Sequence, residues 1–185
     1  MTGLFGGAFD PPHNGHVALV ESARGHFGLE RVLVFVVVVP GHRTVTLDFA
    51  NRYELASLAF TGEPGTEIVP EEHAFTVDAV RDGRYGDAIF LVGADEFAGF
   101  LGWKDPNGLL EHVRLGVATR PGFDPKDLEP VLAGLEHPER VEFFDIPPVH
   151  VSSSQIRACL ARGEPIRGLV PDLVAEAIEA RGLYR

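Results

Sequence analysis

Several residue types that mark well-known functional classes are scarce in this chain of 185 residues. A single cysteine, Cys159, excludes an intramolecular disulfide, and its apolar helical surroundings favour a buried, inert thiol. There are only two lysines, Lys104 and Lys126, and neither stands in the pattern G-x-x-x-x-G-K-[ST], which rules out a P-loop. The formal net charge of −11 argues against nucleic acid as a partner, so any phosphate would need a local cationic site.

Long hydrophobic runs are missing as well. The longest apolar run, residues 32–39, is far shorter than a bilayer span, and residues 1–7 lack the basic start of a signal peptide. We therefore expect a cytoplasmic protein without a membrane partner. With 45% hydrophobic and 23% charged residues, the chain has the balance of a soluble globular protein, and we expect one domain over residues 1–185.

Short β-rich apolar runs alternate with segments of helical periodicity. We predict strands at residues 4–5, 31–39, 88–92, 113–119 and 141–146, and helices at residues 15–27, 47–60, 96–100, 109–112, 153–162 and 171–181. This alternation predicts an α/β fold with a Rossmann-like, doubly wound parallel sheet. In such sheets ligands bind beyond the carboxyl ends of the strands, so the residues after each strand are the candidates for chemistry.

A loop rich in glycine and proline follows the first predicted strand. Gly6 and Gly7 allow a tight turn and a close approach to a ligand, and His13 and His16 lie three residues apart at a predicted helix start. The N–H groups of a helix start suit a phosphate, and two imidazoles there could stabilise charge on phosphorus. The alternatives are a turn with two surface histidines, or a zinc site that lacks a clear third ligand.

A second helix start follows the last predicted strand. Ser152 and Gln155 form a capping-box pattern, which places Ser153 and Ser154 in the first helical turn and Arg157 one turn further on. Arg157 could reach back over this end as a planar cation for phosphate. Taken alone, the pattern indicates a capped helix with an exposed arginine. Together with the histidine loop, it predicts two anion-binding helix ends in one fold.

These two motifs resemble a known family. G-G-x-F-D-P-x-H-x-G-H at residues 6–16 and [IV]-S-S-[ST]-x-I-R at residues 151–157 resemble the HxGH nucleotidyltransferase superfamily. Weaker matches resemble its bacterial nicotinate-nucleotide adenylyltransferases: P-G-H-R at 40–43, A-F-T-V-D at 74–78, V-G-A-D at 92–95, Phe100 with Trp103, A-T-R-P-G at 118–122 and G-L-Y-R at 182–185. The resemblance covers nearly the whole chain.

The resemblance implies a role for each matching residue. His13, His16 and Arg157 would be catalytic. The ATP-binding residues would be Gly6, Gly7, Phe9, His13, His16, Gly93, Asp95, Ser153, Ser154 and Arg157, with His16 nearest the α-phosphate and Asp95 at the ribose. The acceptor-binding residues would be His42, Arg43 and Arg120 for a mononucleotide phosphate, and Thr76 and Trp103 for a pyridine ring and its carboxylate.

Each of the weaker matches also has a structural interpretation. Trp103 could belong to the core, Asp95 could cap a helix, and His42, Arg43 and Arg120 could be solvated surface groups. The chain also departs from the family pattern. Ala8 stands for Thr or Ser, Gly41 for a second proline, Phe75 for Tyr and Ala79 for Thr, and residues 36–39 lack a polar residue common there.

The implied reaction is attack by the phosphate of nicotinate mononucleotide on the α-phosphorus of ATP, giving deamido-NAD and pyrophosphate in NAD biosynthesis. Mg²⁺ would arrive with ATP, and no protein metal site is expected. The alternatives are an adenylyltransferase for nicotinamide mononucleotide or for another phosphorylated acceptor such as phosphopantetheine, a cytidylyltransferase, and an ATP-binding sensor without turnover. The oligomeric state, a homo-oligomer included, is left open.

Overall fold

A parallel sheet forms the centre of the computed structural model, which describes residues 1–40, 44–83, 85–120 and 125–184. The strands are β1 (Thr2–Gly7), β2 (Arg31–Val37), β3 (Thr66–Glu71), β4 (Ala88–Gly93), β5 (Arg114–Thr119) and β6 (Val141–Asp145). They lie in the order β3-β2-β1-β4-β5-β6, and every neighbouring pair is parallel. This is the order of the doubly wound Rossmann sheet, so the predicted fold class is confirmed.

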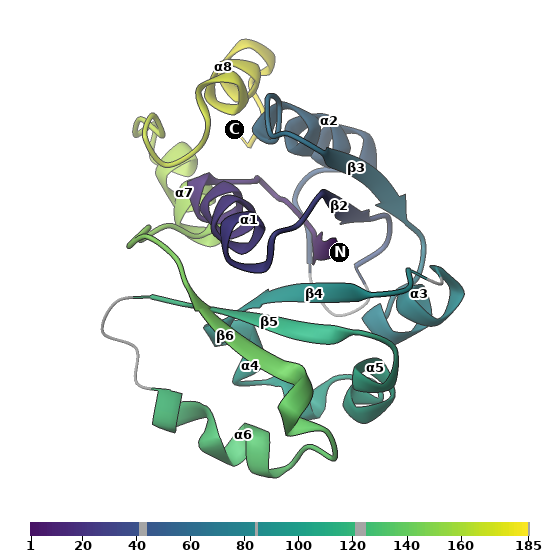
Figure 1. Cartoon of the computed structure of the whole chain (residues 1–185). Helices are drawn as coiled ribbons and strands as arrows, with labels where there is room; N and C mark the ends of the chain where they lie inside the picture. Colours follow the sequence, from purple (N-terminus) through teal and green to yellow (C-terminus); the bar gives the residue numbers. More distant parts are fainter. Residues whose placement is uncertain (41–43, 84, 121–124, 185) are drawn as a thin grey trace.

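Helices cover both faces of this sheet (Figure 1). They are α1 (Asn14–Phe27), α2 (Phe49–Ala59), α3 (Thr76–Gly83), α4 (Ala94–Phe97), α5 (Pro106–His112), α6 (Glu129–Ala133), α7 (Ser153–Ala161) and α8 (Asp172–Arg181), with 3₁₀ turns η1 (Phe100–Gly102), η2 (Pro125–Leu128) and η3 (Pro138–Arg140). α1, α2, α7 and α8 pack on one face, and α3, α4, α5 and α6 on the other. Among the helices of the described residues, none is long and apolar enough to cross a membrane.

Strand β2 shows why its residues had to be apolar on both sides. Val32, Val34 and Val36 belong to the core of the α1 face, whereas Leu33 and Phe35 belong to the core of the α3 face. Successive side chains of a strand point to opposite faces, so a sheet covered on both faces needs an unbroken apolar run. The continuous apolar run therefore predicted this strand, although polar and apolar residues do not alternate in it.

The end of this strand differs from the prediction. β2 stops at Val37 rather than at residue 39, and Val39 is 68% exposed. The carbonyl oxygens of Val37 and Val38 accept hydrogen bonds from the guanidinium of Arg52, at 2.8 and 3.0 Å. Hydrogen bonds from α2 thus end the strand at Val37, although the apolar run in the sequence continues to Val39.

Two elements near the sheet edge were missed by the sequence prediction. β3 contains Pro70 and only a short apolar stretch, which is tolerated because β3 is the edge strand. The eight-residue helix α3, which begins at Thr76 and buries Val77 and Val80, follows it. The short α6 was missed too, and α4 and α5 begin earlier than predicted, at Ala94 and Pro106.

The chain reverses its direction of winding between β1 and β4. From β1 it proceeds outward to β2 and β3, then returns through α3 to place β4 on the other side of β1. At such a switch point the loops that follow the two central strands separate toward opposite faces and leave a crevice. The fold therefore places the histidine loop after β1 beside the Gly93–Asp95 turn after β4.

Candidate active site

A cleft of about 1070 Å³ opens at this switch point. It is bounded by the carboxyl ends of β1 and β4, by the N-terminal ends of α1, α3 and α7, and by the segment that follows α4. The described residues with a predicted site role all line it, namely Gly6, Gly7, Phe9, His13, His16, Thr76, Gly93, Asp95, Trp103, Arg120, Ser153, Ser154 and Arg157. His42 and Arg43, predicted to bind the acceptor, lie outside the described residues.

The two histidines form a stacked pair at the start of α1. His13 is the extended N-cap residue, and its backbone N–H donates to Nδ1 of His16 at 3.1 Å. The two imidazole rings lie 3.6 Å apart between centroids, with an interplanar angle of 15°. Because Nδ1 of His16 accepts a hydrogen bond, the neutral ring carries its proton on Nε2, which makes Nε2 the donor.

His13 is the more deeply buried ring of the pair. Only 9% of the residue is exposed, and burial, with a smaller contribution from the positive charge of Arg120, lowers its pKa to about 4. Its Nδ1 is buried without a hydrogen-bond partner in the described part of the chain. At neutral pH the site therefore presents His13 as a neutral imidazole, which can donate one hydrogen bond but adds no full charge.

Gly15, between the two histidines, makes room for this arrangement. A Cβ atom at this position would lie 3.1 Å from Nδ1 of His13, 3.2 Å from its Cε1 and 3.5 Å from a methyl of Val151. The two shorter distances are tighter than ordinary van der Waals contact, so a side chain here would push the His13 ring. The glycine is needed for close packing, since its backbone is that of an ordinary helix.

The second predicted helix end is present and bonded to the first. Ser152 caps α7 by accepting from the backbone N–H of Gln155 at 3.2 Å, which confirms the predicted cap. Ser153 donates through Oγ to the carbonyl of Pro11 at 2.8 Å, and Arg157 donates to the carbonyl of Asp10 at 2.7 Å. The α7 motif therefore holds the histidine loop in place in addition to lining the cleft.

Sequence reasoning missed the role of three groups that hold the cleft together: Arg52 and Asp10, which are buried, and Tyr184, which is partly buried. Arg52 is 1% exposed and donates to four backbone carbonyls, those of Ala8, Val37, Val38 and Leu47. The Asp10 carboxylate is also buried and accepts from two backbone N–H groups, of residues 46 and 47, and from the hydroxyl of Tyr184 at 2.8 Å. Burial and this bond to Asp10 raise the pKa of Tyr184, so it stays a donor. A charged residue inside the apolar pattern of α2 was the available signal for Arg52.

The far end of the cleft is formed by α3 and the segment after η1. Thr76 is the first residue of α3, and Trp103 is partly buried, with its ring centroid 5.3 Å from Phe100 and 6.3 Å from Phe90. Trp103 thus satisfies both interpretations of the sequence, because it packs on the core and also lines the cleft. Arg120 pairs with the 90% exposed Asp95 at 3.9 Å.

The geometry agrees with what comparisons with known proteins find. Residues 4–159 match the cytidylyltransferase-like family model. A nicotinic acid mononucleotide adenylyltransferase of Plasmodium falciparum, complexed with NaAD, superposes with a TM-score of 0.82 at 17% identity and covers 99% of this chain and 96% of that chain. The fold, the cleft and the family match define the chain as a nucleotidyltransferase of the cytidylyltransferase-like family.

Closer relatives narrow this class. A probable nicotinate-nucleotide adenylyltransferase of Rubrobacter xylanophilus is 37% identical over 195 residues, covering 99% of this chain and 91% of the relative. The protein of the same name from Bordetella avium is also 37% identical, over 99% of this chain and 97% of its own length. The chain belongs to the nicotinate-nucleotide adenylyltransferase family.

The buried state of His13 predicts its titration. In the free protein its NMR signals should titrate with a midpoint of about 4, and Mg·ATP should move the midpoint upward, because polyphosphate favours the imidazolium. The pKa of His13 is 6.5 in the unfolded chain and about 4 in the folded chain. Between these two pH values the unfolded chain binds a proton that the folded chain excludes. The contribution of His13 to the free energy of unfolding is therefore lost as the pH falls from 6.5 to about 4. The NMR signals of His137, which precedes η3 and does not line the cleft, serve as the control for unspecific effects of ATP. A midpoint near 6.5 in the free protein would contradict the burial.

The packing of Gly15 predicts a loss of turnover when a side chain is added at this position. Gly15→Ala should displace the His13 ring by a few tenths of an ångström and lower kcat by about tenfold or more. Gly25→Ala, in the same helix but facing open space, is the matched control. In urea unfolding Gly25→Ala should gain up to about 1 kcal/mol from helix propensity, whereas Gly15→Ala should gain less because its Cβ presses on the His13 ring. Equal kcat in the two variants would show that the position of His13 is unimportant.

Proposed function

We propose that this protein transfers AMP from ATP to nicotinate mononucleotide, giving deamido-NAD and pyrophosphate. The observation that carries the proposal is that two helix starts, one with His13 and His16 and one with Ser153, Ser154 and Arg157, face one cleft. Such helix starts are suited to polyphosphate. The names of the relatives support the acceptor, as does the NaAD bound to the Plasmodium falciparum enzyme.

The reaction requires positioning and charge stabilisation rather than a base. An oxygen of the acceptor phosphate, already an anion at neutral pH, forms a bond to the α-phosphorus of ATP while the bond to the bridging oxygen of the β-phosphate breaks. Pyrophosphate departs with that oxygen. We assign the stabilisation of the α-phosphate to Nε2–H of His16, and that of the leaving pyrophosphate to His13, Arg157 and the first turn of α7.

Other residues of the cleft would bind the two substrates. Gly6, Gly7 and Phe9 would border the nucleotide beside β1, and Gly93 with Asp95 would contact the ribose, near the end of β4. At the acceptor end, Trp103 would stack on the pyridine and Thr76 would meet its carboxylate. Arg120 would leave Asp95 for the acceptor phosphate, together with His42 and Arg43.

Mg²⁺ is the metal that we propose to arrive with ATP. Within the described residues, no group of three or more histidine, cysteine, aspartate and glutamate side chains is arranged to hold a metal ion. Such a protein surface fits a cation carried chiefly by phosphates and water. Bound there, Mg²⁺ would offset the charge of the phosphates. We further propose that residues 1–185 act as one domain in the cytoplasm.

A comparison of acceptors tests the reaction. Pyrophosphate release from Mg·ATP should be rapid with nicotinate mononucleotide and much slower with nicotinamide mononucleotide or phosphopantetheine. CTP in place of ATP is the control for the nucleotide. Turnover with another acceptor would overturn the substrate assignment, and silence with all three would favour the ATP sensor.

The proposed role of His16 gives a second test. His16→Ala should lower kcat by about two to three orders of magnitude, because it removes a donor at the reacting phosphate. The Michaelis constant for ATP should change far less. His26→Ala is the control, because His26 lies on the same helix and pairs with Glu142 at the surface, 3.2 Å away. Near-normal turnover of the His16 variant would remove it from the mechanism.

A further inference from the structure

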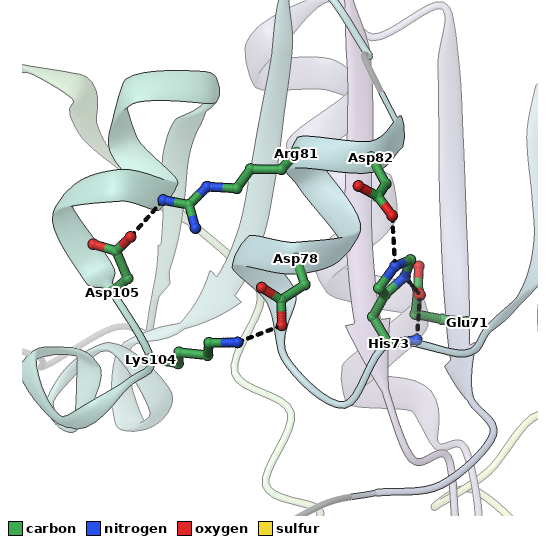
Figure 2. Close-up of polar contacts among 7 residues, drawn as sticks. All are labelled: Glu71, His73, Asp78, Arg81, Asp82, Lys104 and Asp105. Carbon is green, nitrogen blue, oxygen red and sulfur yellow. Dashed lines mark hydrogen bonds and ion pairs between the residues drawn. The ribbon is translucent and has the colours of Figure 1, made fainter.

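Charged side chains border α3 on both sides (Figure 2). This helix carries Thr76 at its first residue, and its buried face packs through Val77 and Val80 into the core of the α3 face. Because the proposed acceptor site lies between Thr76 and Trp103, the distance from α3 to the Trp103 segment sets the width of that site.

Two ion pairs join α3 to the residues that follow Trp103. Asp78 accepts from Nζ of Lys104 at 2.7 Å, and Arg81, one turn further along the same helix, pairs with Asp105 (Figure 2). Asp105 also caps α5 by accepting from the backbone N–H of Gly108 at 3.0 Å. Lys104 and Asp105 are adjacent in the chain, and their partners Asp78 and Arg81 lie three residues apart on α3. The two pairs together fix the register of the Trp103 segment against α3.

Lys104 has a second contact at the mouth of the cleft. Its Nζ lies 4.8 Å from the centroid of the Phe75 ring, which is 44% exposed and precedes Thr76. An ammonium at this distance is attracted by the ring face. Lys104 therefore joins the two sides of the acceptor end. It is bonded to Asp78 of α3, its ammonium lies over the ring of Phe75 before that helix, and it follows Trp103 directly in the chain.

The opposite side of α3 is tied to the sheet. The ring of His73 contacts the carboxylate of Glu71, at the end of β3, at 2.7 Å, and that of Asp82, on α3, at 3.0 Å. Figure 2 shows His73 between these carboxylates, on the side of α3 away from Lys104. With this side fixed, a change in the Lys104 contacts would move the Trp103 segment rather than the whole helix.

We infer that Asp78 and Lys104 are positioning residues, which hold Trp103 at the distance from Thr76 that the acceptor requires. The inference rests on the proposed function. Ion pairs at the surface add little to overall stability, and α3 is held chiefly by its buried valines. The effect of the pair should therefore appear in acceptor binding and in the environment of Trp103, with little change in unfolding.

Charge reversal tests this inference. Asp78→Lys and Lys104→Asp each place like charges together, and should raise the Michaelis constant for the acceptor about two- to fivefold while kcat and the constant for ATP change little. The double variant restores opposite charges and should recover most of the affinity. Arg31 and Glu67, a surface pair outside the cleft lining, provide matched control reversals.

Trp103 supplies a readout that does not depend on activity, because it is the single tryptophan of the chain. Acrylamide quenching of its fluorescence should increase in each single variant, and in the native protein at high salt, and should return toward the native value in the double variant. Unchanged quenching and unchanged acceptor affinity would overturn the inference. So would an equal loss of ATP affinity, or a fall in unfolding midpoint that the double variant does not reverse.

The two proposals fail differently. If no acceptor supports turnover, the proposed function fails and the inference fails with it, even where quenching follows the charge pairing. If nicotinate mononucleotide is used but the single variants bind it normally, the function stands and the positioning role is overturned. Greater quenching with normal acceptor affinity would overturn the positioning role as well.

Discussion

The buried carboxylate of Asp10 is the interaction on which the active-site cleft depends. It accepts from the backbone N–H groups of residues 46 and 47 and from Tyr184 near the C-terminus, and the carbonyl of the same residue accepts from Arg157 of α7. Three segments far apart in sequence thereby meet at one residue of the loop after β1. A buried charge is retained only when its hydrogen bonds are satisfied, so this network fixes the segments together.

The network supports the proposed anion site in a chain whose net charge is −11. The bonded groups bring two helix starts to the same cleft, and helix starts supply N–H donors without adding charged residues. His13 is neutral because it is buried, and Arg52 donates to backbone carbonyls. Among the described residues, the arginines that line the cleft are Arg120 and Arg157. Overall composition does not reveal this local arrangement.

Much of the fold was predictable, and the failures have physical causes. The central strands, buried on both faces, must be continuously apolar, and the sequence of β2 and β4 shows this directly. β3 was missed because an edge strand tolerates Pro70 and polar neighbours. α3 was missed because its eight residues, although amphipathic, form little more than two turns, which is shorter than the window over which helical periodicity is read. The end of β2 was misplaced because Arg52, from another element, takes the carbonyls that would extend the strand.

The sequence alone determined the family, the parallel α/β fold and the phosphate-suited ends of α1 and α7, because strand burial, helix capping and glycine turns depend on residues close together in the chain. It could not determine that His13 is neutral, that Trp103 is both core and cleft wall, or that Asp10, Arg52 and Tyr184 hold the loops together. Burial and hydrogen bonding between residues up to 174 positions apart arise only when the sheet has brought its distant connections to one edge.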